Sequence, residues 1–216
     1  MRERSLLIFM IVALGIALPA IVAVWRMDHL ALHMAMNQYH GSFMDLVFPY
    51  ITDLASGWLS AALALILLRK SWRAFLMVGL TSIISAVVVQ LLKQLIFPQV
   101  VRPSAFLEGM PGLSLVAGVE LHRYMSFPSG HTTAAFSLCI GLAVVIGRPW
   151  PAAILAVVAA ILAYSRVYLS QHFTEDILAG ALLGSLVGIG VYWALYRGKW
   201  AHNSGLDRSP FRRQNQ

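Results

Sequence analysis

The chain has 216 residues, of which 59% are hydrophobic and only 12% are charged. This apolar excess is far above that of soluble domains and predicts an integral membrane protein. The formal net charge of +7 is best explained by positive residues that flank membrane spans, so we expect no nucleic-acid partner. The single cysteine, Cys139, lies in an apolar run, which excludes a disulfide within the chain and predicts a buried, unreactive thiol.

Apolar runs of membrane-crossing length recur along the chain and predict an all-α fold, a bundle of six transmembrane helices. The first run follows Met-Arg-Glu-Arg and is long for a signal peptide, so a retained helix is favoured over a cleaved signal. The second run, residues 54–68, is short and must extend into the residues before it. The expected spans are 5–25, 50–69, 74–94, 131–147, 151–167 and 176–197, in one domain that covers residues 1–200.

Three polar segments lie outside these spans. Residues 94–127 contain several prolines and glycines, which predicts a folded loop on the outer face between the third and fourth helices. His29 and His33 have the i, i+4 spacing of metal ligands, but no cysteine or carboxylate completes a site, so interfacial histidines are the preferred interpretation. Residues 201–216 are polar and basic and are expected to form a disordered cytoplasmic tail.

The distribution of positive charge predicts the orientation. With the N-terminus in the cytoplasm, eleven of the sixteen lysines and arginines fall on cytoplasmic segments. The positive-inside rule then places both termini in the cytoplasm. The five cations left on the outer face are Arg26, Lys93, Arg102, Arg123 and Arg166.

Small residues recur at every fourth position on two of the expected helices, as Gly180, Gly184 and Gly188 and as Ala152, Ala156 and Ala160. Such stripes allow close approach of helix backbones in membranes. They predict a tight contact between the fifth and sixth spans that holds Arg166 near His172. A glycine-lined conduit for a ligand is the alternative.

Polar groups gather where the outer ends of the last three spans are expected. Ser129 is a plausible N-cap for the fourth span, and Gly130 permits close backbone approach at a helix start that can bind an anion. Thr174 is expected to cap the sixth span in the same way. Asp176 lies four residues after His172, so its carboxylate can bind one ring nitrogen and raise the basicity of the other.

Taken one at a time, these features have ordinary explanations, such as a common helix start, a surface pair or a snorkelling arginine. Three cations (Lys93, Arg102 and Arg166), two histidines, one aspartate and two helix N-termini on one face together indicate phosphoryl transfer. Cations and amides hold phosphate oxygens. Of the two histidines, His131 and His172, one must be neutral to attack phosphorus. The other must be protonated so that it can give a proton to the leaving oxygen.

The motifs resemble those of the membrane branch of the type-2 phosphatidic acid phosphatase superfamily, which shares its core with vanadium haloperoxidases. The resemblance covers residues 74–195. Pro128-Ser129-Gly130-His131 matches the second motif, and Ser165-Arg166 with His172 and Asp176 matches the third. The family's first motif has six residues between a lysine and Arg-Pro, whereas eight separate Lys93 from Arg102. Either the junction carries two extra residues, or Lys93 is not the phosphate lysine.

The resemblance implies an enzyme without metal or cofactor. His172 is then the nucleophile that forms a phosphohistidine, Asp176 orients it, and His131 protonates the leaving oxygen. The implied phosphate-binding residues are Lys93, Arg102, Ser129, Gly130 and Arg166.

The implied substrate is a phosphomonoester or diphosphate headgroup of a membrane lipid, of the undecaprenyl diphosphate or phosphatidylglycerophosphate type. We expect a multi-pass protein of the bacterial inner membrane with a periplasmic site, whose pocket is lined by residues 97–127 and 25–53. Alternatives are a lipid A phosphatase of the same mechanism and a non-catalytic binder or transporter of phospholipid phosphates. The complete histidine pair argues against the binder, and six spans argue against a vanadate haloperoxidase.

Overall fold

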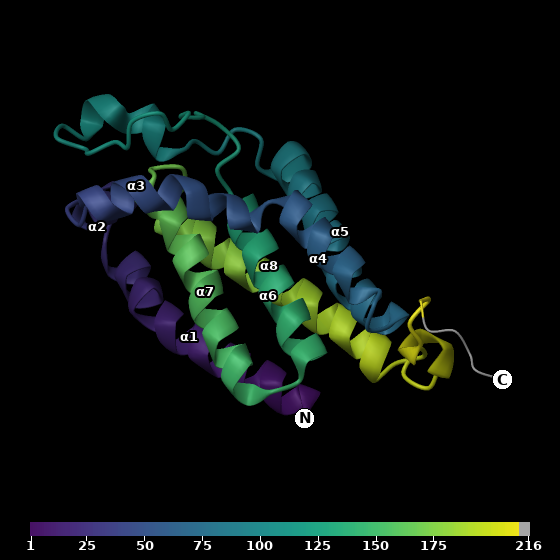
Figure 1. Cartoon of the computed structure of the whole chain (residues 1–216). Coiled ribbons are helices and arrows are strands. Elements are labelled where there is room, and N and C mark those ends of the chain that lie inside the picture. Colours follow the sequence, from purple (N-terminus) through teal and green to yellow (C-terminus); the bar gives the residue numbers. More distant parts are fainter. Residues whose placement is uncertain (212–216) are drawn as a thin grey trace.

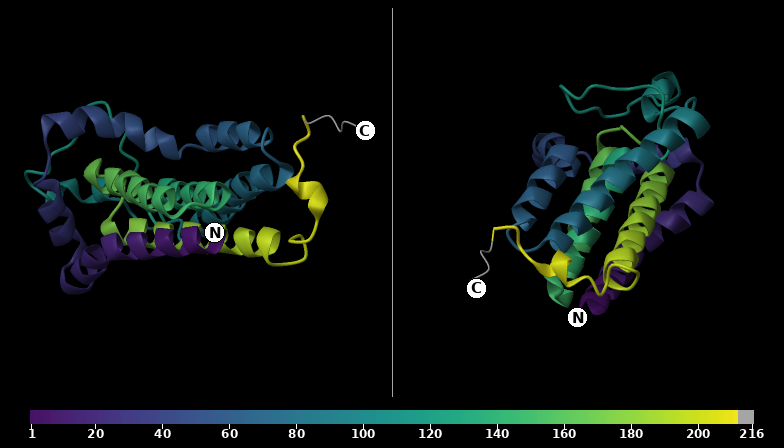
Figure 2. Two further views of the ribbon diagram at one scale, coloured as in Figure 1. Left: turned by 60° about the horizontal axis from the view of Figure 1, so that its bottom comes forward. Right: turned by 90° about the vertical axis from the view of Figure 1, so that its right-hand side faces the viewer.

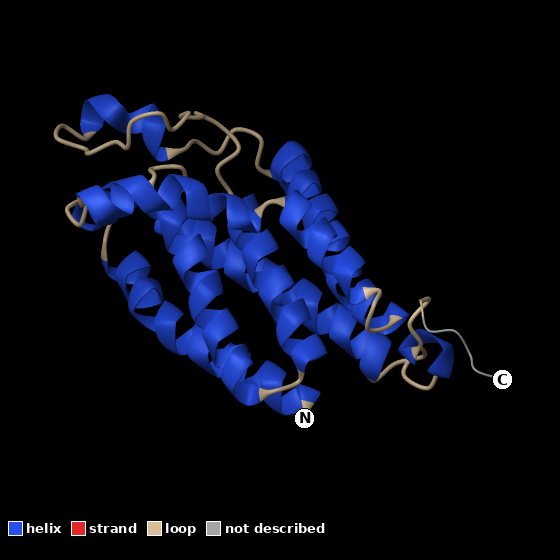
Figure 3. Ribbon diagram, viewed as in Figure 1, coloured by secondary structure: helices blue, strands red, loops and turns tan. Residues whose placement is uncertain are grey.

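The structure is a computed structural model that describes residues 1–211 and contains no β-strand within that range (Figure 3). Four helices of this part of the chain are long and apolar enough to cross a membrane. They are α1 (Arg2–Arg26), α5 (Trp72–Leu91), which is extended by a π-helical turn to Ile96, α7 (Pro149–Tyr168) and α8 (Thr174–Tyr196). The predicted all-helical membrane fold is therefore confirmed.

The region expected to form the second span is broken into two helices. α3 (Ser42–Ile51) continues into a 3-10 turn, Thr52–Ala55, and then into α4 (Gly57–Leu67) at a bend of 53°. Ser56, between them, has an extended backbone, which interrupts the helical hydrogen bonding. The span expected over 50–69 therefore falls on two helices and the turn between them. The described residues contain four spanning helices, or five if the bent pair counts as one span.

α6 (Gly130–Ile146) lies at the centre of the bundle (Figures 1 and 2). It has 17 residues, the lower limit for crossing a bilayer. It packs against α5, α7 and α8, and its side chains Ile140, Ala143 and Val144 are fully buried. Cys139 is also buried, as its sequence context predicts. A helix that is apolar on all sides is expected to lie inside a bundle.

The glycine stripe of α8 packs against α6 and not against α7. A Cβ atom added to Gly180 would lie 2.6 Å from the carbonyl oxygen of Ser129, and one on Gly188 would lie 2.7 Å from Cγ2 of Ile140. α7 instead packs mainly against α1 and α6. The predicted contact between the fifth and sixth helices is therefore wrong, because a stripe of small residues does not encode its partner.

One end of the bundle is covered by short elements. α2 (His29–Asn37) and α3 lie across this end, and the segment after α5, with the 3-10 helix Pro103–Gly109, lies above them (Figure 1). The Asp28 carboxylate starts α2 by accepting hydrogen bonds from the N–H groups of Leu30 and Ala31. The long connection thus contains a short helix, and its place on the outer face stays a prediction.

The opposite end of the bundle holds the N-terminus and the segment after α8 (Figure 1). The expected disorder from residue 201 is wrong for the residues up to 211, which include the 3-10 helix Ser204–Asp207. Arg73 is 4% exposed. It donates to the carboxylate of Asp207 at 2.7 Å and to the carbonyl of Asn203 at 2.9 Å. A buried guanidinium requires such acceptors, so it fixes the tail. Residues 212–216 lie outside the described residues.

Candidate active site

The buried pair His172 and Asp176 forms the centre of the site. His172 belongs to the loop between α7 and α8, and Asp176 to the first turn of α8. Nδ1 of His172 lies 3.3 Å from Oδ2 of Asp176, and the two side chains are 1% and 2% exposed. With Nδ1 facing the carboxylate, Nε2 is the ring nitrogen that remains for chemistry.

The same carboxylate starts α8. Oδ2 of Asp176 accepts the backbone N–H of Phe173 at 2.9 Å, and Phe173 is the N-cap residue of the helix. The prediction that Thr174 caps this helix is therefore wrong: Thr174 is the first helical residue, and its hydroxyl faces Sδ of Met36. Asp176 thus fixes the helix start and the imidazole together.

Ser126 is a third member of this centre, and the sequence analysis missed it. It is fully buried, and its hydroxyl donates to Oδ2 of Asp176 at 2.5 Å. The hydroxyl oxygen of Ser126 also lies 3.4 Å from Nδ1 of His172. The only sequence feature that could have indicated this role is its position, two residues before the motif that begins at Pro128. A serine in a loop, however, has many ordinary explanations.

The surroundings keep His172 neutral. Its pKa is held well below the usual histidine value, first by burial and then by the positive charges of Arg102, Lys93, Arg166 and His131. All four are among the basic groups that are expected from the sequence on the outer face. A neutral imidazole among cations is the form that can act as a nucleophile.

Arg102 is held in an extended segment that pairs with residues before Pro128. Its backbone N–H bonds to the carbonyl of Arg123 at 2.9 Å. Its guanidinium is 9% exposed and donates to the carbonyls of Tyr124 and Gln171 at 2.9 and 3.0 Å. The side-chain amide of Gln171 holds this arrangement by donating to the carbonyl of Glu120 at 2.7 Å. The cation is therefore fixed before any substrate binds.

Lys93 lies in the π-helical turn Leu92–Ile96 at the end of α5. It is 8% exposed, and its ammonium donates to the carbonyl of Met125 at 2.7 Å. Nη2 of Arg102 reaches the same carbonyl at 3.3 Å. The two cations are thus neighbours despite the eight residues between them, which favours the interpretation that the junction carries extra residues. A π-turn accommodates an insertion in a helix and often occurs at functional sites.

Arg166, in the last turn of α7, is 8% exposed. Its Nη1 donates to Oγ1 of Thr52 at 2.9 Å, so the turn between α3 and α4 orients it. Its Nε has no hydrogen-bond partner among residues 1–211. Its carbonyl accepts the N–H groups of Gln171 and His172 at 2.9 and 3.2 Å. This tight loop, and not helix packing, holds Arg166 near His172. An unpaired guanidinium N–H in this place can receive an anion.

Ser129 begins α6 as its N-cap, as its sequence position predicts. Its oxygen accepts the hydroxyl of Thr132 at 3.0 Å, and its own N–H bonds to the carbonyl of Asp176 at 3.0 Å. This last bond joins the first turns of α6 and α8. Gly130 and His131 follow it in the first turn of α6, and His131 lies within electrostatic range of Arg166, Lys93 and Arg102. The first turn of α6 therefore lies near the three cations.

The histidines of α2 take structural positions. Nε2 of His33 lies 3.1 Å from the hydroxyl of Ser170, and the ring of His29 packs edge-on against Phe173. Burial and the nearby His40 lower the pKa of His33 to about 4. No group of three or more His, Cys, Asp and Glu side chains in residues 1–211 is arranged to hold a metal ion.

The sequence matches the model of the PAP2 superfamily over residues 70–200. The match covers more than half of the chain, so this protein belongs to the PAP2 superfamily of lipid phosphatases. A relative from Mycobacterium tuberculosis (strain H37Rv), the decaprenylphosphoryl-5-phosphoribose phosphatase, is 29% identical over 133 residues, which are 61% of this chain and 68% of that protein.

Two solved structures share the fold. Aquifex aeolicus LpxE superposes with a TM-score of 0.65 and 28% identity, covering 76% of this chain and 93% of that one. The transmembrane PAP2-type phosphatidylglycerolphosphate phosphatase of Bacillus subtilis gives a TM-score of 0.62 and 25% identity, covering 88% of this chain and 93% of that one. Together with the long apolar helices, these similarities show an integral membrane protein.

Proposed function

We propose that this protein hydrolyses the phosphomonoester or diphosphate headgroup of a membrane lipid, without a metal, through a phosphohistidine on His172. The observation that carries the proposal is the buried His172–Asp176 pair, at 3.3 Å, with its neutral imidazole among Lys93, Arg102 and Arg166. A site built only to bind phosphate needs cations and amides, but it does not need an oriented nucleophile.

The first chemical step joins Nε2 of His172 to phosphorus. The bond between phosphorus and the leaving oxygen breaks, and His131, which is protonated when the phosphate anion is bound beside it, gives that oxygen a proton. Asp176 and Ser126 hold the imidazole by its Nδ1 side and stabilise the positive charge that develops on the ring. Lys93, Arg102, Arg166, the hydroxyl of Ser129 and the backbone N–H of Gly130 bind the phosphoryl oxygens and offset their negative charge.

The second step returns the enzyme to its starting state. Neutral His131 takes a proton from a water molecule, whose oxygen attacks phosphorus. The bond between phosphorus and Nε2 breaks, inorganic phosphate leaves, and His172 is again neutral. The same histidine therefore acts as an acid and then as a base, as microscopic reversibility requires.

The favoured substrates are undecaprenyl diphosphate and phosphatidylglycerophosphate. The mycobacterial relative is named for a substrate with a decaprenyl chain, and the Bacillus structure for phosphatidylglycerolphosphate. Both names combine a long apolar chain with a phosphate on a small headgroup. That pattern suits a polar site that lies at one end of an apolar bundle.

We further propose that the protein crosses the bacterial inner membrane six times, with both termini in the cytoplasm and the site on the periplasmic face. The six spans are the four long helices, the bent pair α3–α4 and the central α6. Most lysines and arginines then lie on the cytoplasmic side, as the positive-inside rule requires. The segment 97–127 lies on the outer face.

Phosphate release by the purified protein in detergent tests the proposed function. The panel contains undecaprenyl diphosphate, phosphatidylglycerophosphate, phosphatidate and lipid A, each with EDTA. His172→Ala is compared with His202→Ala, a variant of an exposed histidine at the opposite end of the bundle. We expect release that persists in EDTA, is lost in His172→Ala and is unchanged in His202→Ala. Near-normal turnover by folded His172→Ala would refute the mechanism.

A further inference from the structure

A cavity of about 360 Å³ opens beside the candidate nucleophile pair. Asp176 contributes to its wall, and four phenylalanines with two valines give the rest an apolar surface. The phenylalanines come from the segments 97–127 and 169–173, and His29 of α2 closes one side. His29 and the residues from 97–127 lie in the two regions expected to line the pocket, whereas Phe173, Glu175 and Asp176 lie outside both regions. The cavity offers little to a phosphate, but it suits the apolar part of a substrate.

This cavity continues along the bundle through shared lining residues. His29 and Glu175 also line a second cavity of about 290 Å³. Leu32 of that second cavity also lines a third, of about 620 Å³, between α1, α2, α7 and α8. The three spaces therefore adjoin one another from Asp176 towards the side of the bundle, and the middle one is lined by Asp28, His29 and Glu175 beside apolar residues.

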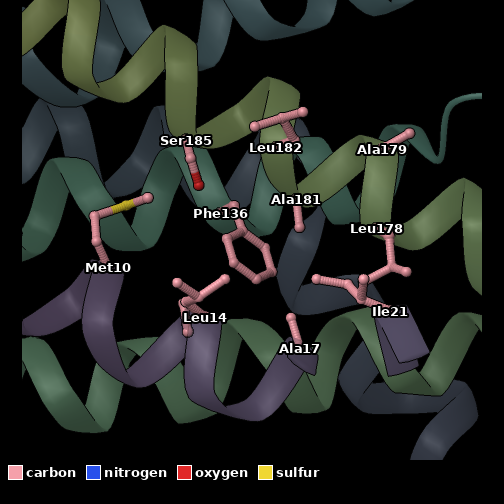
Figure 4. A pocket seen from close by; sticks show the side chains of 11 residues that line it. Met10, Leu14, Ala17, Ile21, Phe136, Leu178, Ala179, Ala181, Leu182 and Ser185 are labelled. Carbon is pink, nitrogen blue, oxygen red and sulfur yellow. The ribbon is translucent and has the colours of Figure 1, made fainter. Parts of the chain in front are cut away.

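The row of adjoining cavities runs on into a groove between α1 and α8. The third cavity and a fourth, of about 360 Å³, share five lining residues: Ala13, Ala17, Phe136, Leu178 and Ala181. Figure 4 shows Ala17 of α1 and Ala181 of α8 facing the same space, with the ring of Phe136 between them. Alanine leaves room where larger residues would close the contact between the helices.

The chemistry of this row of cavities selects its occupant. Its far part is lined almost wholly by hydrocarbon side chains, and helical backbone groups in a membrane are satisfied within their own helices. The groove can thus offer packing contacts but few hydrogen bonds. At its near end lies Asp176, whose carboxylate contacts the imidazole of His172. A molecule that fits both ends has a phosphate head and a long hydrocarbon tail.

We propose that the groove between α1 and α8 binds one hydrocarbon chain of the substrate while its phosphate lies at His172. This inference rests on the proposed function and assigns to the α1–α8 face the recognition of long-chain lipid phosphates. The first carbons of the chain contact the phenylalanines beside Asp176. The chain then passes His29 and Leu32 and lies against Ala17 and Ala181.

Phosphate release from hexyl phosphate and hexadecyl phosphate tests this assignment, because only the longer chain reaches the groove. Ala17→Leu and Ala17→Trp fill the groove by different amounts. The matched control is Leu18→Trp on the same helix: Leu18 is 56% exposed and does not line these cavities. We expect kcat/KM for hexadecyl phosphate to fall about tenfold in Ala17→Trp, with a smaller loss in Ala17→Leu. Hydrolysis of hexyl phosphate should stay within about twofold of wild type in all variants.

The outcomes separate the two proposals. Equal hydrolysis of hexadecyl phosphate by wild type and both Ala17 variants overturns the groove assignment and leaves the phosphatase intact. Parallel losses on both substrates in Ala17→Leu also overturn it, because the residue then acts through the fold. If the wild type hydrolyses neither alkyl phosphate nor any lipid phosphate, the proposed function itself is refuted.

Discussion

Replacing Ser126 by alanine tests whether the centre of the site depends on a residue outside the recognised motifs. The hydroxyl of Ser126 donates to Oδ2 of Asp176 at 2.5 Å and is fully buried, so water cannot replace it in the variant. Oδ2 then keeps the N–H of Phe173 and Nδ1 of His172. The imidazole loses part of its support, while the helix start remains.

The size of the effect follows from the kind of bond removed. A hydrogen bond to a charged group contributes about 1.5–3 kcal/mol. If this support acts mainly in the transition state, when the His172 ring becomes positive, kcat falls about tenfold to a hundredfold, since about 1.4 kcal/mol corresponds to one factor of ten. KM should change little, because Ser126 donates to Asp176 and no role in binding the phosphate is assigned to it.

The assay measures kcat and KM for hexyl phosphate in detergent, together with thermal unfolding of each variant. Ser137→Ala is the matched control, because Ser137 is also fully buried and bonds only within α6, to the carbonyl of Ala134 at 3.1 Å. We expect it to retain wild-type kcat. Wild-type kcat in Ser126→Ala would contradict the role of this hydroxyl. If Ser137→Ala also loses activity, and to the same extent, the loss in Ser126→Ala reflects a structural effect alone.

Three further predictions use stability and pH. Gly184→Ala should lower the unfolding free energy by about 1–3 kcal/mol, because the new Cβ would clash with the carbonyl oxygen of Thr133 and would lie 3.0 Å from Cβ of Phe136. In Gly190→Ala the new Cβ meets no neighbour, and thermal unfolding compares the two variants. Arg73→Ala should lower the free energy of unfolding by about 2 kcal/mol because its hydrogen bonds are lost, whereas Arg69→Ala, at an exposed position, should change it little. Equal unfolding of the two variants in a urea titration would contradict this prediction. The low pKa of His172 keeps it neutral, so the acid limb of kcat/KM, corrected for substrate titration, should lie below about pH 6.5. An acid limb above that pH would contradict the assignment of His172 as a neutral nucleophile. Because the pKa of His172 is lower in the folded than in the unfolded protein, the contribution of His172 to stability is full above about pH 6.5 and declines as the pH falls.

The amino-acid sequence determined the class of the protein and indicated the residues on which the proposed chemistry depends. Long apolar runs leave few alternatives to membrane helices, because backbone polar groups in a bilayer must bond within their own segment. The geometry of the proposed site residues is encoded locally: Ser129 starts α6, and His172 and Asp176 are joined by one turn of chain. Short-range geometry of this kind can be read before any fold is known.

Tertiary structure decided the features that depend on which segments meet. The glycine stripe at Gly184 predicts a close contact, but only the fold assigns it to α6. Likewise, Lys93 joins Arg102 because both reach the carbonyl of Met125, which sequence spacing could not establish. Ser126 and Thr52 support the site across 50 and 114 positions of the chain. A hydroxyl has many possible partners, so its role becomes visible only when the fold has brought one of them within bonding distance.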